Sequence, residues 1–243
     1  MSIGNVIGPG VGGVAGRAPG GDAEFGIKVK TAWPTTFFMR KWREHDKHAP
    51  GIIEHLQQLK GAASQNIESG IAPGAKSEAG LYESRLDLFE TTQHVGIRAL
   101  AAFIDETIRD VVSGVNGRKL APDQLRVEFT DSWCHITNDS GFHDAHYHGG
   151  CSWCGIYYLQ SGDTPSEKPA HAGNGVNRFY SPIAIGGLSE DYGNSYLSSC
   201  NFDIPPRDGL LFVFPSYILH AGLPYTGGRD RVIISFNSKT HVK

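Results

Sequence analysis

The chain contains 243 residues, of which 40% are hydrophobic and 19% are charged, together with 31 glycines and 13 prolines. This balance excludes a wholly disordered or collagen-like protein and allows a sizeable core in one large domain. The formal charge is -3, so no basic excess points to nucleic acid or to an anionic membrane. The sequence shows neither an apolar run of about 18 residues nor the pattern of a signal peptide. We therefore expect a cytoplasmic protein with no nucleic-acid and no membrane partner.

Residues 1–25 are rich in glycine and show no apolar period, so they are expected to form a flexible arm. Within them, Gly8, Gly10 and Gly13 have the GxGxxG spacing of a dinucleotide-binding loop. Such a loop follows a strand and opens a helix, and Pro9 with its glycine neighbours supplies neither. This interpretation is therefore rejected.

The first half of the chain predicts helical support for a later core. Residues 26–38 suggest an edge strand, whereas residues 61–80, rich in Ser, Gly and Ala, suggest a loop. Between them, residues 50–60 carry one apolar helical stripe, formed by Ile52, Ile53, Leu56 and Leu59. Three nearby histidines are expected on exposed helix surface: His45, His48 and His55. Residues 95–112 show the clearest helical period, which a Gly- and Asn-containing run ends.

After Pro122 the sequence changes to short apolar or alternating runs separated by Gly, Pro, Asn and Asp. The candidate strands are LRVEFTDSWCHI, FHDAHYH, WCGIYYLQ, NRFYSPI, GLLFVFP and RVIISFN. They predict an antiparallel unit, a barrel or jelly roll, over about residues 125–238. Two long polar loops, Gln160 to Asn177 and Gly186 to Cys200, are expected to cover a site.

The four cysteines are too few for a disulfide framework and are expected to be reduced. Cys151 and Cys154 form a CxxC pair, whereas Cys134 and Cys200 stand alone. A structural zinc site usually needs a second pair, so zinc at this CxxC pair is disfavoured.

The histidines of HDAHYH are the strongest sign of chemistry in the sequence. Side chains two apart in a strand share a face, so Asp144, His146 and His148 would point one way and His143 the other. Far downstream, His220 ends the run FPSYILH before a Gly-Pro turn, where a strand can deliver a side chain to a barrel mouth. Two imidazoles from one strand and one from another would form a facial metal site with open positions. The alternative is a set of solvated surface histidines.

A carboxylate anchor is suggested by Arg231, which would share a strand face with Ile233 and Ser235. A buried arginine beside a hydroxyl suits a small carboxylate. A surface arginine is the commoner case, and by composition Arg229 serves equally well.

Two tryptophans, Trp133 and Trp153, flank the histidine strand. They could line a substrate pocket, but aromatic residues on strands more often belong to the core. Phe212 and Phe214 alternate with aliphatic residues and predict a fully buried strand.

In their order, these motifs resemble the non-haem Fe(II)- and 2-oxoglutarate-dependent oxygenases, particularly their bacterial and phage branch. That branch has HxH followed by SGVYY, a Phe-Pro-Ser segment ending in His, and an Arg-led strand ending in Phe-Asn. The counterparts here are HYHGGCSWCGIYYL, FPSYILH and RVIISFN, with SWCHITNDSG upstream. The resemblance covers roughly residues 125–238. It implies a mainly β fold with flanking helices and a double-stranded β-helix (jelly-roll, cupin-like) core at about 121–243, in one domain from residue 26 with helical support over 26–120.

Carried over to this sequence, the resemblance implies an iron site and a 2-oxoglutarate site. The iron ligands would be His146, His148 and His220. Arg231 would pair with the distal carboxylate of 2-oxoglutarate, Tyr158 would place its hydroxyl against the same carboxylate, and Ser235 would assist. O₂ is the other co-reactant.

The sequence departs from the family at His148, where the usual two-histidine, one-carboxylate triad has Asp or Glu. Either the triad is all-histidine, or Asp144 supplies the carboxylate. We favour His146 and His148, because the spacing from His148 to GIYYL matches the branch. Asp144 would then be an acceptor that fixes an imidazole tautomer. A halogenase, with Ala or Gly at this position, is disfavoured because His148 can still bind metal.

The implied activity is hydroxylation of a C–H bond in a small molecule or an amino acid, free or carrier-bound, with decarboxylation of 2-oxoglutarate to succinate. Activity should fall at acid pH as the histidines become protonated. Two alternatives stay open: a cupin-like metal-binding module without turnover, and a three-histidine dioxygenase that does not use 2-oxoglutarate. The sequence does not settle the substrate, for which a protein remains an option, or the oligomeric state, for which a homodimer is one option.

Overall fold

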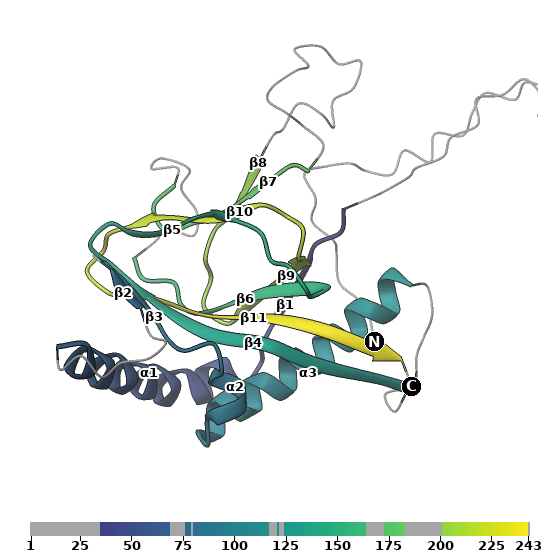
Figure 1. The fold of residues 1–243 in the computed structure, drawn as a ribbon, viewed down its shortest axis with the longest axis horizontal. Helices are drawn as coiled ribbons and strands as arrows, with labels where there is room; N and C mark the ends of the chain where they lie inside the picture. The colour runs from purple at the N-terminus through teal and green to yellow at the C-terminus, as the bar shows by residue number, and fades with distance from the viewer. Residues whose placement is uncertain are drawn as a thin grey trace, which may run out of the picture.

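The computed structural model describes residues 35–68, 76–78, 80–116, 121, 124–163, 173–182 and 201–242 (Figure 1). The expected arm over residues 1–25 lies outside this part of the chain, as do most of the expected edge strand over 26–38 and the loop from 186 to 200. Of the loop between Gln160 and Asn177, only the two ends are described.

Two antiparallel sheets form a jelly roll in the described residues (Figure 1). The larger has the order β1-β9-β6-β11-β4-β3-β2 and the smaller the order β5-β10-β7-β8. The larger sheet contains β1 (Phe38–Lys41), β2 (Lys76–Glu78), β3 (Leu81–Glu83), β4 (Leu125–Thr137), β6 (Trp153–Gln160), β9 (Leu210–Pro215) and β11 (Arg231–Val242). The smaller contains β5 (Gly141–His146), β7 (Asn177–Tyr180), β8 (Asn201–Ile204) and β10 (His220–Tyr225). The mainly β, double-stranded β-helix fold predicted from the sequence is confirmed.

Three helices lie against the larger sheet, on the side away from the smaller one (Figure 1). They are α1 (His45–Glu68), α2 (Leu88–Thr91) and α3 (Val95–Val115). The helix predicted for residues 95–112 is confirmed as α3. Its sheet-facing stripe is buried and repeats every three or four residues: Ile97, Leu100, Ile104, Ile108 and Val111.

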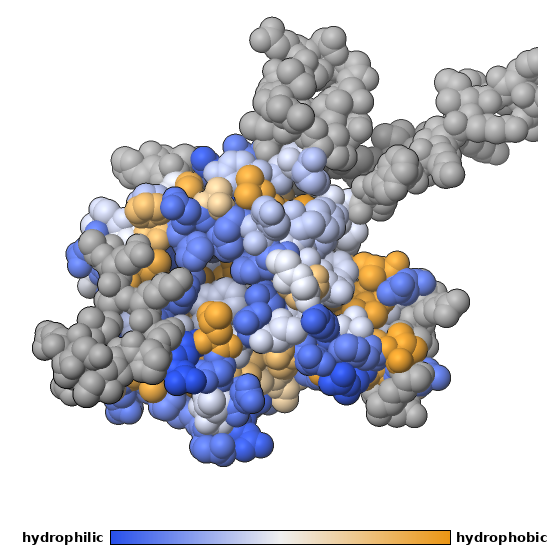
Figure 2. Space-filling model, in the orientation of Figure 1, coloured by the Kyte–Doolittle hydropathy of each residue, from blue (hydrophilic) through white to orange (hydrophobic). Residues whose placement is uncertain are grey.

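The outer side of the helical layer is mainly hydrophilic. In Figure 2, the lower part of the molecule, where the helices lie in Figure 1, shows a mainly hydrophilic surface with smaller hydrophobic patches. In the described part of the chain, no helix combines the length and the apolar composition that crossing a membrane requires.

The predicted loop over residues 61–80 is wrong in two places. Helix α1 continues to Glu68, and residues 76–78 form β2, which pairs with β3. Once a helix is nucleated, each added residue gains a hydrogen bond, so α1 extends beyond its apolar stripe into a Gly- and Ala-rich segment. The short strand β2 pairs with β3, and β3 pairs with β4, and a local sequence pattern does not reveal these pairings.

The expectation that His45 lies on exposed helix surface is also wrong. His45 is buried at the start of α1, and its Nδ1 lies 2.7 Å from the hydroxyl of Tyr157 on β6. His48 and His55 are half-buried. The helix therefore contributes one polar contact, as well as apolar side chains, to the interface with the sheet.

Side-chain alternation divides the larger sheet into two faces. On β6, Tyr157 belongs to the core shared with the helices, whereas Tyr158 belongs to the core between the sheets. On β11, Ile234 packs on the helical side and Ile233 between the sheets. We call these the helix-side face and the inner face.

A tight turn connects β4 of the larger sheet to β5 of the smaller one. Its central residues, Asp139 and Ser140, have φ of 47° and 66°, and Gly141 donates its N–H to the Asn138 carbonyl. Positive φ at both central positions is the signature of a hairpin turn that matches strand twist. At Gly141, a Cβ would come within 2.0 Å of the carbonyl oxygen of Gly80, so a side chain does not fit there. The turn carries the chain, and the histidines of β5, over to the smaller sheet.

Candidate active site

A pocket lies between the sheets, lined by the inner face of the larger sheet and by β5, β7 and β10 of the smaller. Its lining combines aromatic, aliphatic and histidine side chains with one arginine: Leu81, Trp133, His135, Thr137, Phe142, His143, His146, His148, Gly155, Ile156, Asn177, Phe214, His220, Gly222, Leu223, Arg231, Ile233, Ser235 and Phe236. Apolar walls with a few convergent polar groups are typical of small-molecule sites.

Three of the predicted residues form one cluster in this pocket. His146 ends β5 and His220 opens β10, and the two are direct partners in the antiparallel pairing of these strands. His148 follows β5 and is held by a hydrogen bond from its backbone N–H to the Ser216 carbonyl. One nitrogen from each imidazole lies within 4.8 Å of the others. The three histidines that the sequence analysis selected can therefore hold one metal ion.

The structure corrects two details of the histidine motifs. Strand β5 ends at His146, so His148 reaches the cluster from a loop rather than by strand alternation. His220 begins β10 and does not end the preceding run, because β9 stops at Pro215 and a turn follows. Gly222 and Pro224, read as a turn from the sequence, lie within β10.

Hydrogen bonds to backbone carbonyls orient two of the imidazoles. His146 places Nδ1 2.7 Å from the Asp144 carbonyl oxygen, and His220 places Nδ1 3.0 Å from that of Ile218. Donation from Nδ1 leaves Nε2 without a proton, and such partners fix the tautomer of metal-binding histidines. Asp144 does supply an acceptor, as expected, but through its main chain. Its side chain is exposed and is not among the groups that could share a metal.

Burial keeps these histidines neutral. It lowers the pKa of His148 to about 4 and that of His220 to about 3, with a smaller contribution from the neighbouring His146. For His220 the burial comes from aromatic side chains: Phe179 stacks on its ring and Phe214 contacts it edge-on. Neutral imidazole is the metal-binding form, so the cluster is prepared to bind metal at neutral pH.

Arg231 lies on the inner face, 3% exposed, in the same pocket. One of its terminal nitrogens donates to the Asn177 side-chain oxygen, and Tyr158 donates to the same oxygen at 2.9 Å. Its Nε is buried and has no hydrogen-bond partner among the described residues. A buried, unsatisfied guanidinium nitrogen is costly unless a ligand accepts from it. Ser235 is also buried and lines the pocket on the same strand.

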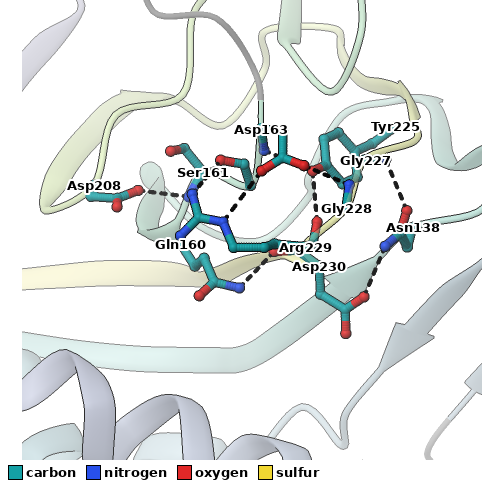
Figure 3. A network of polar contacts seen from close by, with 11 residues as sticks. Asn138, Gln160, Ser161, Asp163, Asp208, Tyr225, Gly227, Gly228, Arg229 and Asp230 are labelled. Atoms are coloured by element: carbon teal, nitrogen blue, oxygen red, sulfur yellow. Dashed lines mark hydrogen bonds and ion pairs between the residues drawn. The ribbon is translucent and has the colours of Figure 1, made fainter.

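A network of polar contacts fixes the loop that leads into Arg231 (Figure 3). Tyr225, at the end of β10, donates its hydroxyl to the Arg229 carbonyl at 2.6 Å and accepts from the backbone of Asp163 at 2.9 Å. The Asp163 carboxylate accepts from the Gly228 backbone and contacts the Arg229 guanidinium at 3.3 Å. Arg229 is thus exposed and paired with a carboxylate, outside the pocket. It is not an equivalent of Arg231.

The residue directly before Arg231 is held from two sides. Asn138 donates to the Asp230 carboxylate at 3.1 Å, and Gln160 donates to the Asp230 carbonyl at 2.7 Å (Figure 3). The backbone entering Arg231 is therefore tied to the ends of β4 and β6, which gives the guanidinium a fixed position.

Asn177, which joins Arg231 to Tyr158, was not predicted as a site residue. Its only sequence signal is a polar residue at the start of the apolar run NRFY. A core role was predicted for Trp133, which is buried but lines the pocket, with its ring centroid 5.8 Å from that of His148. Trp153, by contrast, packs against the helix-side core as expected.

Comparison with known proteins agrees with this geometry. Residues 131–237 match the family described as "Putative 2OG-Fe(II) oxygenase". The match includes all three clustered histidines and Arg231. The match lies within the jelly-roll part and covers less than half of the chain, and it indicates a 2-oxoglutarate-dependent oxygenase. The comparison with curated proteins found no significant match.

Solved structures with the same fold share little sequence with this chain. The epimerase SnoN, in complex with Fe3+, alpha ketoglutarate and nogalamycin RO, has a TM-score of 0.54 at 12% identity, covering 85% of this chain and 81% of that one. HygX from Streptomyces hygroscopicus, with nickel, 2-oxoglutarate and hygromycin B bound, has a TM-score of 0.50 at 12% identity, covering 84% and 83%. At this identity the likeness establishes the fold only.

The residues present fit the metal and the cosubstrate that the family uses. Three imidazoles that burial keeps neutral each place one nitrogen within 4.8 Å of the others, which suits Fe(II). Arg231 lines the same pocket, and its unsatisfied Nε suits the carboxylate of 2-oxoglutarate.

Proposed function

We propose that His146, His148 and His220 hold Fe(II) and that Arg231 binds the distal carboxylate of 2-oxoglutarate, assisted by Ser235. The proposed reaction is hydroxylation of a C–H bond in a small molecule or an amino acid, free or carrier-bound, with decarboxylation of 2-oxoglutarate to succinate. Bound Fe(II) and 2-oxoglutarate supply the oxidising chemistry, and the protein positions the reactants and excludes water.

One observation carries the proposal: Arg231, which has an unsatisfied and buried guanidinium nitrogen, lines the same pocket as the histidine cluster. A metal-binding module has no need of a buried cation with a free donor. A dicarboxylate that spans from metal to arginine uses both features. The family match supports this function over the two alternatives that do not use 2-oxoglutarate.

Around the proposed cosubstrate, each residue has a definite task. Asn177 accepts from Arg231 and Tyr158 together, so it holds the guanidinium and the phenol side by side. Burial raises the pKa of Tyr158, which keeps its hydroxyl protonated as a donor. Trp133 and Phe214 give the pocket apolar walls next to the histidines, which excludes water from the reacting centre.

The geometry supports His148, rather than Asp144, as the third iron ligand. A nitrogen of His148 lies in the cluster, whereas the exposed Asp144 contributes its backbone carbonyl to His146. The proposed triad is therefore all-histidine. Exchange of His148 for Asp would restore the usual two-histidine, one-carboxylate set.

The test is anaerobic addition of Fe(II) and 2-oxoglutarate, read from the visible charge-transfer band of the iron chelate. Wild type should show the band. In Arg231→Ala the 2-oxoglutarate concentration at the midpoint of the titration should rise at least roughly 30-fold, because the distal carboxylate loses its buried, charged partner. Arg229→Ala is the matched control, since this exposed arginine pairs with Asp163, and it should keep the wild-type midpoint within about threefold.

A wild-type protein that binds iron tightly but gives no band at any 2-oxoglutarate concentration would overturn the proposed function. Equal midpoints for wild type and Arg231→Ala would leave the oxygenase in place and remove Arg231 as the anchor.

A small-molecule substrate is supported by the rim of the pocket. Phe142 lines the pocket and is 53% exposed. An exposed aromatic side chain at a pocket mouth suits a ligand with an apolar or planar face. Succinate release, measured over panels of natural-product-like molecules, amino acids and prolyl peptides, would assign the class. Stimulation by the peptides alone would contradict a small-molecule substrate.

A further inference from the structure

A second cluster of metal-binding side chains lies beside the proposed iron site. It consists of Glu83 at the end of β3, His135 on β4 and His143 on β5, and its three ligand atoms lie within 4.8 Å of one another. None of them belongs to the proposed triad, although the rings of His143 and His146 have centroids only 4.2 Å apart.

The sheet topology brings these three residues together. Glu83 and His135 are direct partners in the β3–β4 pairing, and the turn after β4 returns the chain to place His143 next to them. One carboxylate oxygen of Glu83 lies 2.8 Å from Nε2 of His135 and 3.7 Å from Nε2 of His143. Ligand atoms around a tetrahedral metal with bonds of about 2.0–2.2 Å are roughly 3.3–3.6 Å apart. One of the two observed separations is shorter than this range and the other is slightly longer.

The polar contacts around His135 bring two kinds of metal-binding group together. Nε2 of His135 lies 2.8 Å from the Glu83 carboxylate and 3.1 Å from the indole nitrogen of Trp133, and His135 and Glu83 are both largely buried. With a proton on Nε2, His135 donates to Glu83. A metal ion bound here would replace that proton and take Nε2 and the carboxylate as ligands.

We propose that Glu83, His135 and His143 form a second binding site for a divalent transition-metal cation, separate from the histidine triad. Two imidazoles and one carboxylate are the donor set found in many zinc and non-haem iron sites. His135 and His143 also line the pocket. A cation held here would therefore place positive charge in the wall that faces a bound substrate, which favours substrates with oxygen-rich or anionic groups at that end.

The test is the stoichiometry of Co(II) binding to the metal-free full-length chain, followed by visible absorption and by calorimetry. Wild type should bind two equivalents. Glu83→Gln, which is nearly isosteric, should bind one, and His220→Ala should bind one at the other site. The double variant should bind none. The matched control is Glu128→Gln, because Glu128 also contacts a histidine, His241 at 3.0 Å, but in a half-buried position outside the pocket. This variant should retain two equivalents.

The outcomes separate this proposal from the proposed function. One equivalent in wild type that survives Glu83→Gln and is lost in His220→Ala would overturn the second site and leave the first. Two equivalents in Glu83→Gln would also overturn it. Loss of the iron and 2-oxoglutarate band in Glu83→Gln, with the band retained in His220→Ala, would move the iron to this cluster and overturn both assignments. Should Glu83→Gln fail to fold by circular dichroism, the half-buried His143→Gln replaces it with the same expectations.

Discussion

Tyr157 and Tyr158 are neighbours on β6, both fully buried, yet they serve opposite faces of the sheet. The hydroxyl of Tyr157 contacts His45 of helix α1 on the helix-side face, which completes a closed interface. The hydroxyl of Tyr158 donates to Asn177 on the inner face, beside an arginine that still has a free donor. Two adjacent tyrosines thus lie in two different environments. The polar groups around Tyr157 have partners within the protein, whereas those around Tyr158 include an arginine donor that a ligand could use.

The buried polar atoms that lack a hydrogen bond lie on the inner face. In the described part of the chain, the buried side-chain atoms without a hydrogen bond are Arg231 Nε and Asn237 Oδ1, both at odd-numbered positions of β11. A buried group without a partner costs stability, and such groups persist where function requires them. Substitutions on the helix-side face should therefore change the stability of the protein, and substitutions on the inner face should change its affinity for ligands.

The largest expected effect is on the inner face, at His220. Replacing it in His220→Ala removes one of three proposed ligands, and Fe(II) affinity should fall more than about 100-fold, since even loss of a ligand's hydrogen-bond partner costs about 10- to 100-fold. Anaerobic Fe(II) titration measures this. Thermal unfolding of the metal-free protein is the control and should change little, and unchanged iron affinity would remove His220 from the site.

On the helix-side face, Ile104→Ala should produce the reverse result. Ile104 is fully buried on α3, so the truncation should cost about 2–5 kcal/mol of unfolding free energy. Urea unfolding measures the loss, while the 2-oxoglutarate midpoint of the folded fraction should stay at the wild-type value. A large shift of that midpoint would show that the two faces are coupled.

Asn177 allows a finer test on the inner face. Asn177→Ala removes the acceptor shared by Arg231 and Tyr158, and 2-oxoglutarate should bind about tenfold more weakly, corresponding to about one hydrogen bond to a charged group. Asn177→Asp should be worse, because a carboxylate would neutralise Arg231 in place of the cosubstrate. Isothermal titration of both variants gives the order, and tighter binding in Asn177→Asp than in Asn177→Ala would contradict this role.

The smallest effect concerns pH and the contact between His45 and Tyr157. Burial lowers the pKa of His45 below its usual 6.5, so the unfolded chain takes up a proton there first as the pH falls. The free energy of unfolding should therefore decrease as the pH drops below about 6.5 toward the folded-state pKa. His45→Gln should show a shallower decrease in urea unfolding between pH 7.5 and 5. A slope equal to that of wild type would mean that other groups cause the pH dependence.

Much of the fold could be predicted because local patterns carry it. The stripe of α3 and the apolar runs of β4, β6, β9 and β11 identified their elements directly. Strand β10 was missed because Gly222 and Pro224 weaken its local β signal, and its existence depends on pairing with β5 and β7. The strands β2 and β3 likewise exist through their neighbours.

For the site, the sequence selected the three clustered histidines and Arg231 by motif order. It could not show that His148 arrives from a loop, that Asp144 turns its side chain outward or that Asn177 joins Arg231 to Tyr158. These facts depend on where β5 ends and on how the smaller sheet lies against the larger. Glu83 was equally hidden, since a glutamate in a short strand gives no local sign that two distant histidines will meet it.

The pairing of His146 with His220 has a thermodynamic consequence. These residues face each other across β5 and β10, so the two imidazoles come together only when the smaller sheet is formed. A metal held between them binds the folded state and not the unfolded one. Each tenfold rise of free metal above its dissociation constant would then add about 1.4 kcal/mol to the free energy of unfolding. The melting temperature of this enzyme should therefore rise with metal concentration.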